Sequence, residues 1–401
     1  MNRRVTRYKK QTAVMVQGDE KGKKRRNFDA FLNVSGALRI VIAGGGTGGH
    51  LFPGIAIAQE FLARNPENRV LFVGTERPFE ISILSETGFK HKTITAEGFK
   101  GRGFWNQIVS ISKIPKGVIE SILILKRFKA DLVVGVGGYS AGPLVTGAWL
   151  LGINIVLHEQ NILSGITNRI LSRFADRIYV SFNETKAGLN PEKIRVTGNP
   201  VRKEILQFAR EQKDVHTTDS EQRRQFAILI LGGSQGAHSI NMAVLEAIEL
   251  IDDKEAYFFV HQTGAHDEIR VKSVYREQGV PCRVEAFFND MGRQYQKADL
   301  IICRAGATTV AEVKAIGKGV IFIPFPFAAD DHQVLNARSL VDAGAAEMIL
   351  EKDLSGKALA ERINFYAANP GDLHRMASRA GDFGRVDAAA AIVDDCYELI
   401  S

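Results

Sequence analysis

Apolar and polar positions alternate with two different periods along this chain, from Leu38 onward. Short apolar runs rich in Val, Ile and Leu, such as 38–44 and 69–74, are typical of buried strands. The longer stretch 53–65 repeats its apolar residues at helical spacing, on a face with Ile55 and Phe61. Strands that alternate with amphipathic helices predict a parallel sheet covered on both faces, the doubly wound α/β arrangement. Further strands are expected at 130–138, 154–160 and 176–182.

The same alternation restarts at Phe226, which predicts a second sheet of the same kind. The chain has 401 residues, more than one hydrophobic core usually serves, and two domains are therefore expected. We place the join near 196–205, where Gly198 and Pro200 separate a strand from the next helix. In open α/β sheets, ligands bind beyond the carboxyl ends of the strands, so the site is expected in a cleft between two facing domains.

The predicted organisation is α/β, with two doubly wound Rossmann-like domains facing a cleft. The expected units are a basic, disordered extension at 1–37, an N-terminal domain at 38–198, a C-terminal domain at 199–375, and a helical segment at 376–401, whose return to the N-terminal domain we leave open.

The charge of the chain is divided unevenly, although the net charge is only +7. Residues 1–26 hold ten Lys or Arg against two acids, and residues 38–198 hold 19 basic against 12 acidic residues. Residues 199–401 hold 23 basic against 30 acidic residues. The basic first half indicates an anionic partner, whereas the acidic second half argues against a nucleic-acid binder.

Three further features limit the class of protein. The first 26 residues lack the apolar core of a secretory signal; a disordered extension and a polybasic segment attracted to anionic lipid both stay open. The uncharged stretch 132–157 is interrupted by glycines and Pro143, which favours a strand, a short helix and a strand over a membrane span. Three dispersed cysteines indicate a reducing compartment without disulfides.

A glycine-rich segment, VIAGGGTGGHLFPG at 41–54, follows the first strand. Residues 44–49 match the G-x-G-x-x-G pattern of dinucleotide sites, so a nicotinamide-dependent oxidoreductase is one alternative. Two residues argue against it. Pro53 predicts a helix that begins near Pro53, after a longer loop, and Gly74 stands where the next strand would supply a ribose-binding acid. The loop is therefore expected to approach something larger than a dinucleotide phosphate.

Two segments of the second half predict a site for a diphosphate and a ribose. The loop at 229–241 offers the backbone of its glycines and the hydroxyl of Ser234 at a helix start, which suits a phosphate. In 303–312, Thr308 and Thr309 stand at another helix start. Glu312 follows one turn later and could accept two hydrogen bonds from a ribose.

Polar residues at other strand ends suit a sugar. The segment 324–337 places Asp330 or Asp331 as a helix N-cap, followed by His332 and Gln333. The segment 157–161 ends in Gln160 and Asn161. For His158, Glu159 and His332, a structural role is as well supported as a direct one.

Seven segments in this order, GGGTGGHLFPG, GVGGYSAGP, HEQN, GNPVR, GGSQGA, RAGATTVAE and AADDHQ, resemble those of the MurG family from residue 38 to the C-terminus. Members of this family add N-acetylglucosamine to the undecaprenyl-pyrophosphoryl-muramoyl-pentapeptide of bacterial cell walls. The resemblance implies the glycosyltransferase type B fold, with UDP-N-acetylglucosamine as donor and that lipid, lipid I, as acceptor. It further implies that the N-terminal domain faces the acceptor and the membrane and that the C-terminal domain binds the UDP-sugar. Other UDP-sugar transferases, and UDP-sugar epimerases of the same fold, stay open as alternatives on the donor site alone.

The resemblance also implies which residues bind the donor. Carried over by matching segments, they are Thr47, Gly48 and Gly49 in the first loop, Asn161 on the sugar, Arg202 and Ser234 at the diphosphate, the backbone of Phe288 at the uracil, Ala307, Thr308, Thr309, Val310, Ala311 and Glu312 at the diphosphate and ribose, and Gln333 at the sugar hydroxyls.

The implied reaction is an inverting displacement at the anomeric carbon by the muramoyl hydroxyl. His50 is the expected base, since an imidazole suits neutral pH; a role in positioning the acceptor is the alternative. The pattern of acids indicates no metal site, and no cofactor is expected.

The stretch 98–129 mixes basic with aromatic and aliphatic residues, among them Phe104, Trp105, Ile108, Lys113 and Lys116. Together with the basic first half and the resemblance, it predicts peripheral attachment to anionic lipids on the cytoplasmic side of the inner membrane. Other proteins of cell-wall synthesis and division are further expected partners.

Overall fold

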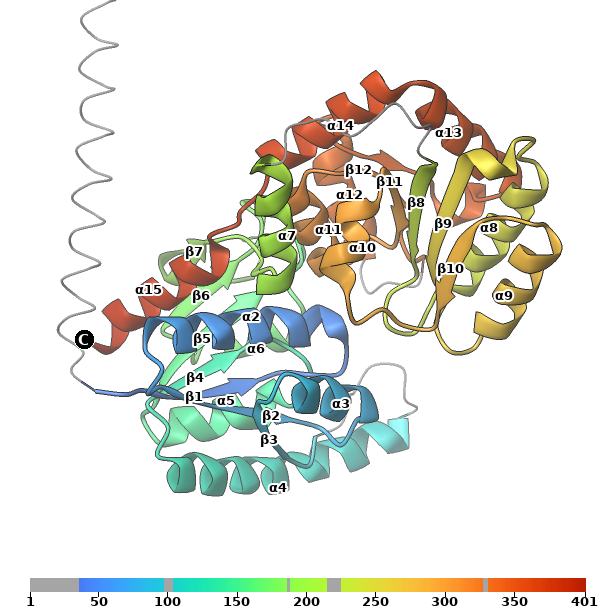
Figure 1. Cartoon of the computed structure of the whole chain (residues 1–401). Coiled ribbons are helices and arrows are strands. Elements are labelled where there is room, and N and C mark those ends of the chain that lie inside the picture. The colour runs from blue at the N-terminus through green and yellow to red at the C-terminus, as the bar shows by residue number, and fades with distance from the viewer. Residues whose placement is uncertain (1–35, 97–103, 186–187, 215–224, 327–330) are drawn as a thin grey trace, which may run out of the picture.

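A computed structural model describes residues 36–96, 104–185, 188–214, 225–326 and 331–401, and the predicted extension at 1–37 lies almost entirely outside them. Two α/β units, each built on one sheet, lie one above the other in Figure 1. The first sheet has seven strands in the order β3-β2-β1-β4-β5-β6-β7. The second has six in the order β10-β9-β8-β11-β12-β13. This arrangement confirms the predicted fold class.

The elements of the first unit alternate strand and helix, as the sequence pattern predicts. Its strands are β1 (Arg39–Ala43), β2 (Arg69–Gly74), β3 (Lys90–Thr93), β4 (Leu132–Gly135), β5 (Asn154–Glu159), β6 (Arg177–Val180) and β7 (Ile194–Val196), and its helices are α2 (Gly48–Arg64), α3 (Pro78–Glu86), α4 (Phe104–Phe128), α5 (Ala141–Leu150) and α6 (Ile166–Leu171).

The second unit repeats the alternation, and three helices end the chain. Its strands are β8 (Phe226–Leu231), β9 (Tyr257–Gln262), β10 (Cys282–Glu285), β11 (Leu300–Cys303), β12 (Gly319–Phe322) and β13 (Glu347–Met348); its helices are α7 (Lys203–Asp214), α8 (His238–Glu249), α9 (Glu268–Glu277), α10 (Met291–Lys297), α11 (Ala307–Ile316), α12 (His332–Val341), α13 (Gly356–Ala368) and α14 (Pro370–Asp382), followed by α15 (Ala388–Ile400).

Helices cover both faces of each sheet, which explains the continuous apolar runs. Strand β1 pairs in parallel with β2 and β4, and Ile40, Val41 and Ile42 are all fully buried. Ile40 and Ile42 belong to a core with α2, whereas Val41 belongs to the opposite core with α5. A strand buried on both faces has no polar side to alternate with. Strand β3, with the sequence KHKT, is a half-exposed edge strand and for that reason lacked the apolar signal.

The expected start of α2 at Pro53 is wrong. Helix α2 begins at Gly48, with Thr47 in the extended N-cap conformation, and Pro53 lies inside the helix. A proline in this position lacks the N–H that would bond to the carbonyl four residues earlier, here that of Gly49. The first turn can still form, because the Leu51 N–H donates to the Thr47 carbonyl at 3.1 Å.

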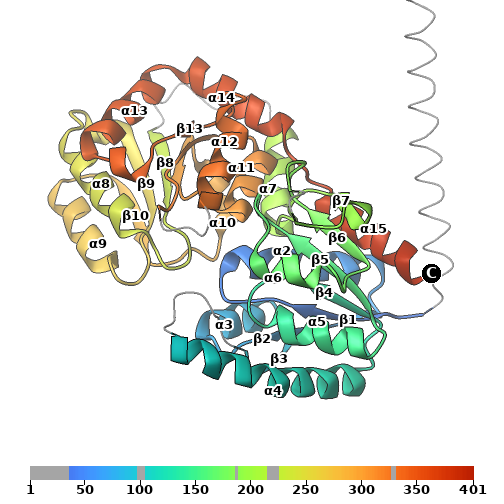
Figure 2. The same cartoon turned by 180° about the vertical axis from the view of Figure 1, so that it is seen from behind.

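The last helix, α15, packs against the first unit rather than the second. Ile392, Val393 and Cys396 are buried in one core with residues of β1 and α2, and Figures 1 and 2 both show α15 beside α2. The amide of Asn68 donates to the Tyr397 hydroxyl at 2.8 Å. The chain thus runs from the first unit to the second and ends on the first.

The uncharged stretch 132–157 contains β4, α5 and the start of β5, as predicted. Within the described residues, every helix is too short or too polar to pass through a bilayer.

Candidate active site

The glycine-rich loop after β1 is held in place by hydrogen bonds to a buried carboxylate, that of Glu80. Glu80 of α3 accepts hydrogen bonds from the backbone N–H of Gly46 and, at 3.0 Å, from that of Thr75. A Cβ on Gly45 would lie 2.5 Å from the Glu80 carboxylate, and one on Gly44 would lie 2.1 Å from a Val136 methyl. Gly44 and Gly45 are therefore required by close packing, because a side chain at either position would overlap Val136 or Glu80.

His50 is fixed in one orientation at the carboxyl end of β4. Its Nδ1 lies 3.0 Å from the Val136 carbonyl and 3.1 Å from Oε1 of Gln160. Both of these are acceptors, because the Gln160 amide nitrogen itself donates to the Val136 carbonyl at 2.8 Å. Nδ1 therefore holds the hydrogen, and the neutral ring keeps a lone pair on Nε2. The ring lies against Gly137, where a Cβ would be 2.8 Å from Nδ1.

A cavity of about 560 Å³ lies over the carboxyl ends of β1, β4 and β5. Its walls come from several loops of the first unit and from His332 at the start of α12 in the second. The predicted site residues Thr47, His50 and Asn161 all line it. The cavity therefore has the place that the doubly wound topology predicts for a ligand.

Two polar residues of the segment 157–161, Glu159 and His158, form buried hydrogen bonds behind the cavity wall. Glu159 is buried and accepts hydrogen bonds from the backbone N–H of Gly165 at 3.0 Å and from the amide of Asn168 at 2.8 Å. His158 is fully buried with Nε2 3.4 Å from the Gly198 carbonyl. Burial lowers the pKa of His158 to about 4, against a smaller opposing effect of that carbonyl. Both side chains hold the loop in place.

The first turn of helix α11, in the second unit, contacts the start of α2 directly. The Thr308 hydroxyl donates to the Gly49 carbonyl at 3.0 Å, and this is the carbonyl that Pro53 leaves without a helical donor. The Gly49 carbonyl, which Pro53 leaves without a donor in α2, therefore finds its hydrogen-bond donor in the other unit. No pattern in the sequence could predict this contact, because 259 residues separate its two ends.

Arg202, just before α7, and Glu312 of α11 form a buried ion pair. The guanidinium of Arg202 approaches Oε1 of Glu312 at 3.0 Å, and the Tyr295 hydroxyl donates to Oε2 at 2.9 Å. Arg202 also lies over the ring of Phe52 in α2, 4.2 Å from its centroid. Burial alone would lower the pKa of Arg202, but the charges of Glu312 and Glu204 raise it. The structure thus joins two predicted site residues and adds Tyr295, which sequence reasoning missed.

Asn161 connects the two units at the edge of the cavity. Its Oδ1 accepts a hydrogen bond from the amide of Asn336 in α12 at 3.2 Å, and Oδ1 of Asn336 accepts from the backbone N–H of Ile162 at 3.2 Å. Asn336 is fully buried and was not predicted as part of the site. An asparagine inside an amphipathic helix gives no signal by itself of what it contacts.

The remaining predicted residues are spread along the second unit. Ser234 lies in the loop between β8 and α8, and Oε1 of Gln333 accepts from the backbone N–H of Phe325 at 3.0 Å. Phe288 is fully buried, and its N–H donates to Oε1 of Gln262 at 3.0 Å. The side chains of Ala307 and Val310 belong to the core, whereas Thr309 and Ala311 are half-exposed.

The membrane-facing prediction falls partly outside the described residues. Phe104, Trp105, Ile108 and Lys113 lie in α4, but their side chains are outside the described part of the structure. Lys116, farther along α4, is exposed, as are Ile119 and Leu123.

Models of two domain families match the chain: the glycosyltransferase family 28 N-terminal domain at residues 40–180, and the glycosyltransferase family 28 C-terminal domain at residues 227–392. A protein of Syntrophus aciditrophicus is 46% identical over 364 residues, which is 90% of this chain and 99% of that protein. A protein of a Geobacter species is 49% identical over 358 residues, 89% of this chain and 95% of that protein. Both are named UDP-N-acetylglucosamine--N-acetylmuramyl-(pentapeptide) pyrophosphoryl-undecaprenol N-acetylglucosamine transferase.

Solved structures show the same fold. The MurG of Acinetobacter baumannii is 29% identical and superposes with a TM-score of 0.69, covering 90% of this chain and 99% of that one. A UDP-GlcNAc 2-epimerase of Neisseria meningitidis, at 16% identity and a TM-score of 0.64, covers 90% of this chain and all of its own. At that identity the likeness concerns the fold alone.

Proposed function

This chain belongs to glycosyltransferase family 28, and from that premise we propose that it transfers N-acetylglucosamine from UDP-N-acetylglucosamine to lipid I. Lipid I is undecaprenyl-pyrophosphoryl-N-acetylmuramoyl-pentapeptide, and the product is lipid II of peptidoglycan synthesis. The chain is a UDP-N-acetylglucosamine-dependent hexosyltransferase, since relatives that are 42–49% identical to it over about nine-tenths of its length are named as N-acetylglucosamine transferases.

The orientation of His50 is the observation that carries the mechanism. Its Nδ1 is engaged by Val136 and Gln160, so the lone pair of Nε2 is available at a cavity formed by both units. In the proposed step, Nε2 takes the proton of the muramoyl hydroxyl while its oxygen forms a bond to the anomeric carbon of the donor sugar. The bond between that carbon and the diphosphate breaks, and UDP leaves with the electron pair. A single displacement inverts the configuration at the anomeric carbon.

The leaving diphosphate gains negative charge, and the N-terminus of α11 is suited to stabilise it. The N–H groups of Ala307, Thr308 and Thr309 lie in the first turn, before the first helical hydrogen bond from Val310 to Gly306, and together with the hydroxyls of Thr308 and Thr309 they are donors near the positive end of the helix dipole. Ser234 is proposed to bind the diphosphate from the other loop. In this scheme, Thr308 exchanges the carbonyl of Gly49 for a phosphate oxygen when the donor binds.

Arg202 and Glu312 are proposed to serve the donor as a pair. Oε1 of Glu312 accepts two hydrogen bonds from the Arg202 guanidinium, at 3.0 and 3.3 Å, whereas Oε2 accepts one from Tyr295 and retains a second lone pair for a ribose hydroxyl. Arg202 neutralises that carboxylate beside the diphosphate. The Phe288 carbonyl is proposed to receive the uracil N–H.

The acceptor sugar is proposed to occupy the cavity beside the glycine-rich loop. The donor sugar is proposed to lie against Thr47, Gly48 and Gly49 of this loop. Asn161 and Gln333 are proposed to form hydrogen bonds with the hydroxyls of the donor sugar. The pyrophosphate of lipid I then lies near the loop glycines, and the lipid chain runs toward the exposed apolar side chains of α4, α5 and α6. These include Leu123, Trp149 and Ile170, each more than half exposed.

The proposed function is tested by transfer of labelled N-acetylglucosamine from UDP-N-acetylglucosamine to a short-chain lipid I. The expected product contains one added sugar and appears with the release of one UDP. Omission of the acceptor is the control, since conversion of the UDP-sugar without acceptor would indicate an epimerase instead. A folded protein that binds UDP but does not modify lipid I would contradict the proposal.

A further inference from the structure

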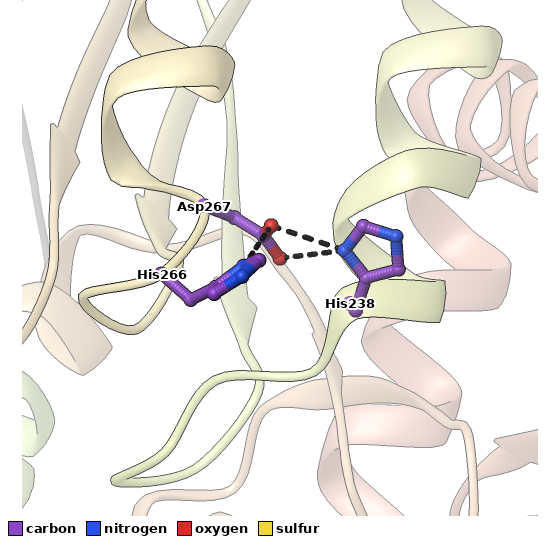
Figure 3. Close-up of side chains that lie close together, drawn as sticks. All are labelled: His238, His266 and Asp267. Carbon is purple, nitrogen blue, oxygen red and sulfur yellow. Dashed lines mark hydrogen bonds and ion pairs between the residues drawn. The ribbon is translucent and has the colours of Figure 1, made fainter.

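Three side chains outside the cavity meet at the start of α8 (Figure 3). His238 is the first residue of α8, and His266 and Asp267 lie in the turn between β9 and α9. Nδ1 of His238 lies 3.0 Å from both carboxylate oxygens of Asp267. Nδ1 of His266 lies 3.0 Å from Oδ1 of the same carboxylate. Two imidazole nitrogens and one carboxylate therefore point toward a common centre.

The carboxylate is held rigidly, whereas the imidazoles reach solvent. The side chain of Asp267 is 6% exposed, against 61% for His238 and 90% for His266. The amide of Asn241, which is fully buried, donates to Oδ2 of Asp267 at 2.8 Å and to the Thr263 carbonyl at 2.9 Å. Oδ1 of Asn241 in turn lies 3.0 Å from Nε2 of His261. A buried network of this kind orients a carboxylate in the way that outer partners orient metal ligands.

The two segments that supply the histidines are packed against each other through glycines. A Cβ on Gly236, two residues before His238, would lie 2.1 Å from the Thr263 carbonyl. A Cβ on Gly264, two residues before His266, would lie 2.5 Å from the Gln235 carbonyl. Any larger residue at these two positions would force the loops apart. The relative position of His238 and His266 is therefore fixed by backbone contact, which is the preorganisation that a binding site needs.

We propose that His238, His266 and Asp267 bind a divalent transition-metal cation, of which Zn²⁺ is the probe of choice. Imidazole nitrogens favour Zn²⁺, Co²⁺ and Ni²⁺ over Mg²⁺ and Ca²⁺, which prefer oxygen. Around an ion with bonds of about 2.0–2.1 Å, tetrahedral ligand atoms lie roughly 3.3 Å apart. The two separations of 3.0 Å between an imidazole nitrogen and Oδ1 of Asp267 need to change by only a few tenths of an ångström, and all three ligand atoms lie within 4.8 Å of one another. Each imidazole would bind through the lone pair of Nδ1, with its hydrogen on Nε2.

Three protein ligands leave at least one coordination position open to water or to another ligand. The site follows directly after the loop of Ser234, so the bound cation would fasten that loop to the turn between β9 and α9. This inference does not depend on the proposed transfer reaction, because it concerns binding of an ion to the full chain.

Calorimetric titration of the full-length protein, free of any histidine tag, with ZnCl₂ tests the proposal. One Zn²⁺ per chain is expected. Co²⁺ is expected to give the intense visible absorption of a site with nitrogen ligands. His238→Ala, His266→Ala and Asp267→Asn should each weaken Zn²⁺ binding by more than about tenfold, since even partners of the ligands commonly contribute that much.

His374→Ala is the matched control, because His374 is also exposed but lies on α14, away from the cluster. It should leave the affinity and the stoichiometry unchanged. UDP binding and circular dichroism establish that each variant is folded. Absence of Zn²⁺ binding by the native chain, or equal binding by folded His266→Ala and His374→Ala variants, would overturn the proposal.

Discussion

At the scale of single residues, the contacts of His50 decide which of its nitrogens can act. Val136 and Gln160 both present oxygen to Nδ1, and Gln160 is itself fixed by its bond to the Val136 carbonyl. The tautomer follows from this network rather than from any property of the histidine alone. The two roles that the sequence leaves open for His50, base and positioning group, therefore become separable by experiment.

Replacement of His50 by alanine is expected to lower kcat roughly 10²- to 10⁴-fold, the usual contribution of a general base. The affinity for UDP should change little, because the proposed partners of UDP lie in the second unit. Steady-state kinetics with short-chain lipid I and a separate UDP titration measure the two quantities. Turnover near that of the native enzyme would remove the assignment of His50 as the base.

Two buried histidines predict how the stability of the protein depends on pH. Burial lowers the pKa of His158 to about 4 and that of His261 to about 3, both from 6.5. Below pH 6.5 the unfolded chain binds protons that the native chain excludes, so the free energy of unfolding falls as pH decreases. The expected decrease is up to about 1.4 kcal/mol per pH unit for each histidine.

Urea unfolding between pH 7.5 and pH 5 measures this dependence. The window lies above the ordinary titration range of Asp and Glu, which separates the histidines from the carboxylates. A free energy of unfolding that stays constant or rises as the pH is lowered would contradict the prediction.

At the scale of elements, helix α2 shows how one proline affects the contact between the two units. The missing N–H of Pro53 leaves the Gly49 carbonyl available, and Thr308 of α11 fills that position. A helix with a regular residue at position 53 would satisfy the carbonyl by itself. Helix α2 is therefore suited to bind α11 because its own hydrogen bonding is incomplete.

A double-mutant cycle of Pro53→Ala and Thr308→Val tests this account. Thr308→Val is expected to lower the free energy of unfolding by about 1 kcal/mol in the native background, because the Gly49 carbonyl loses its partner. In the Pro53→Ala background the loss should be clearly smaller, since the new N–H can bond to that carbonyl. Denaturant unfolding of the four proteins gives the coupling, and effects that add to within about 0.3–0.5 kcal/mol would contradict the contact.

The C-terminal helix α15 illustrates packing between distant parts of the chain. Ile392 is fully buried in the core of the first unit. Ile392→Ala is expected to lower the free energy of unfolding by about 2–5 kcal/mol through lost burial and a cavity. Ile269→Ala, at a position 85% exposed on α9, is the control and should change stability by less than about 0.5 kcal/mol. Equal effects of the two substitutions would show that α15 is not docked in solution.

At the scale of the whole molecule, exposed apolar side chains extend from the cavity, which Ile114 and Ile170 help to line, onto helix α4. Helix α4 lies on the side of the first sheet that faces away from the second unit (Figures 1 and 2). It packs on α5 through Gly117, whose Cβ would lie 3.3 Å from Pro143. Ile119 and Leu123 remain exposed on α4, beside Lys116. This combination of apolar and basic side chains suits an anionic leaflet.

Leu123→Glu is expected to weaken binding to vesicles that contain anionic lipid several-fold, because it places a negative charge among the exposed apolar side chains of the stretch 98–129, which the sequence predicts to contact the membrane. UDP binding should be unaffected. Ile269→Glu makes the same change at an exposed site of the second unit and should bind vesicles like the native protein. Vesicle sedimentation measures both, and equal binding by the two variants would place the membrane contact elsewhere.

Local pattern was sufficient for the two sheets and for the order of most elements. Strands buried on both faces appear as continuous apolar runs, and the helices between them keep an apolar stripe. Each type of element can therefore be recognised from a few consecutive residues. The edge strand β3 was missed because its exposed positions are polar. The early start of α2 was missed because its first turn forms through backbone bonds from His50 and Leu51 to the Thr47 carbonyl, despite three glycines and Pro53 nearby. The family followed from seven ordered segments and agrees with the matched domain models.

The sequence by itself thus determined the fold class, the family and the types of residue that the reaction needs, because these depend on local spacing and side-chain chemistry. Only the tertiary structure decided which groups face one another: Gln160 with His50, Thr308 with Gly49, Tyr295 with the pair of Arg202 and Glu312, and the cluster of His238, His266 and Asp267. Most of these contacts join residues far apart in the chain. The contact of Thr308 with Gly49 depends on how the two units pack, and the other contacts depend on how distant segments meet within one unit. A local sequence pattern contains no information about either.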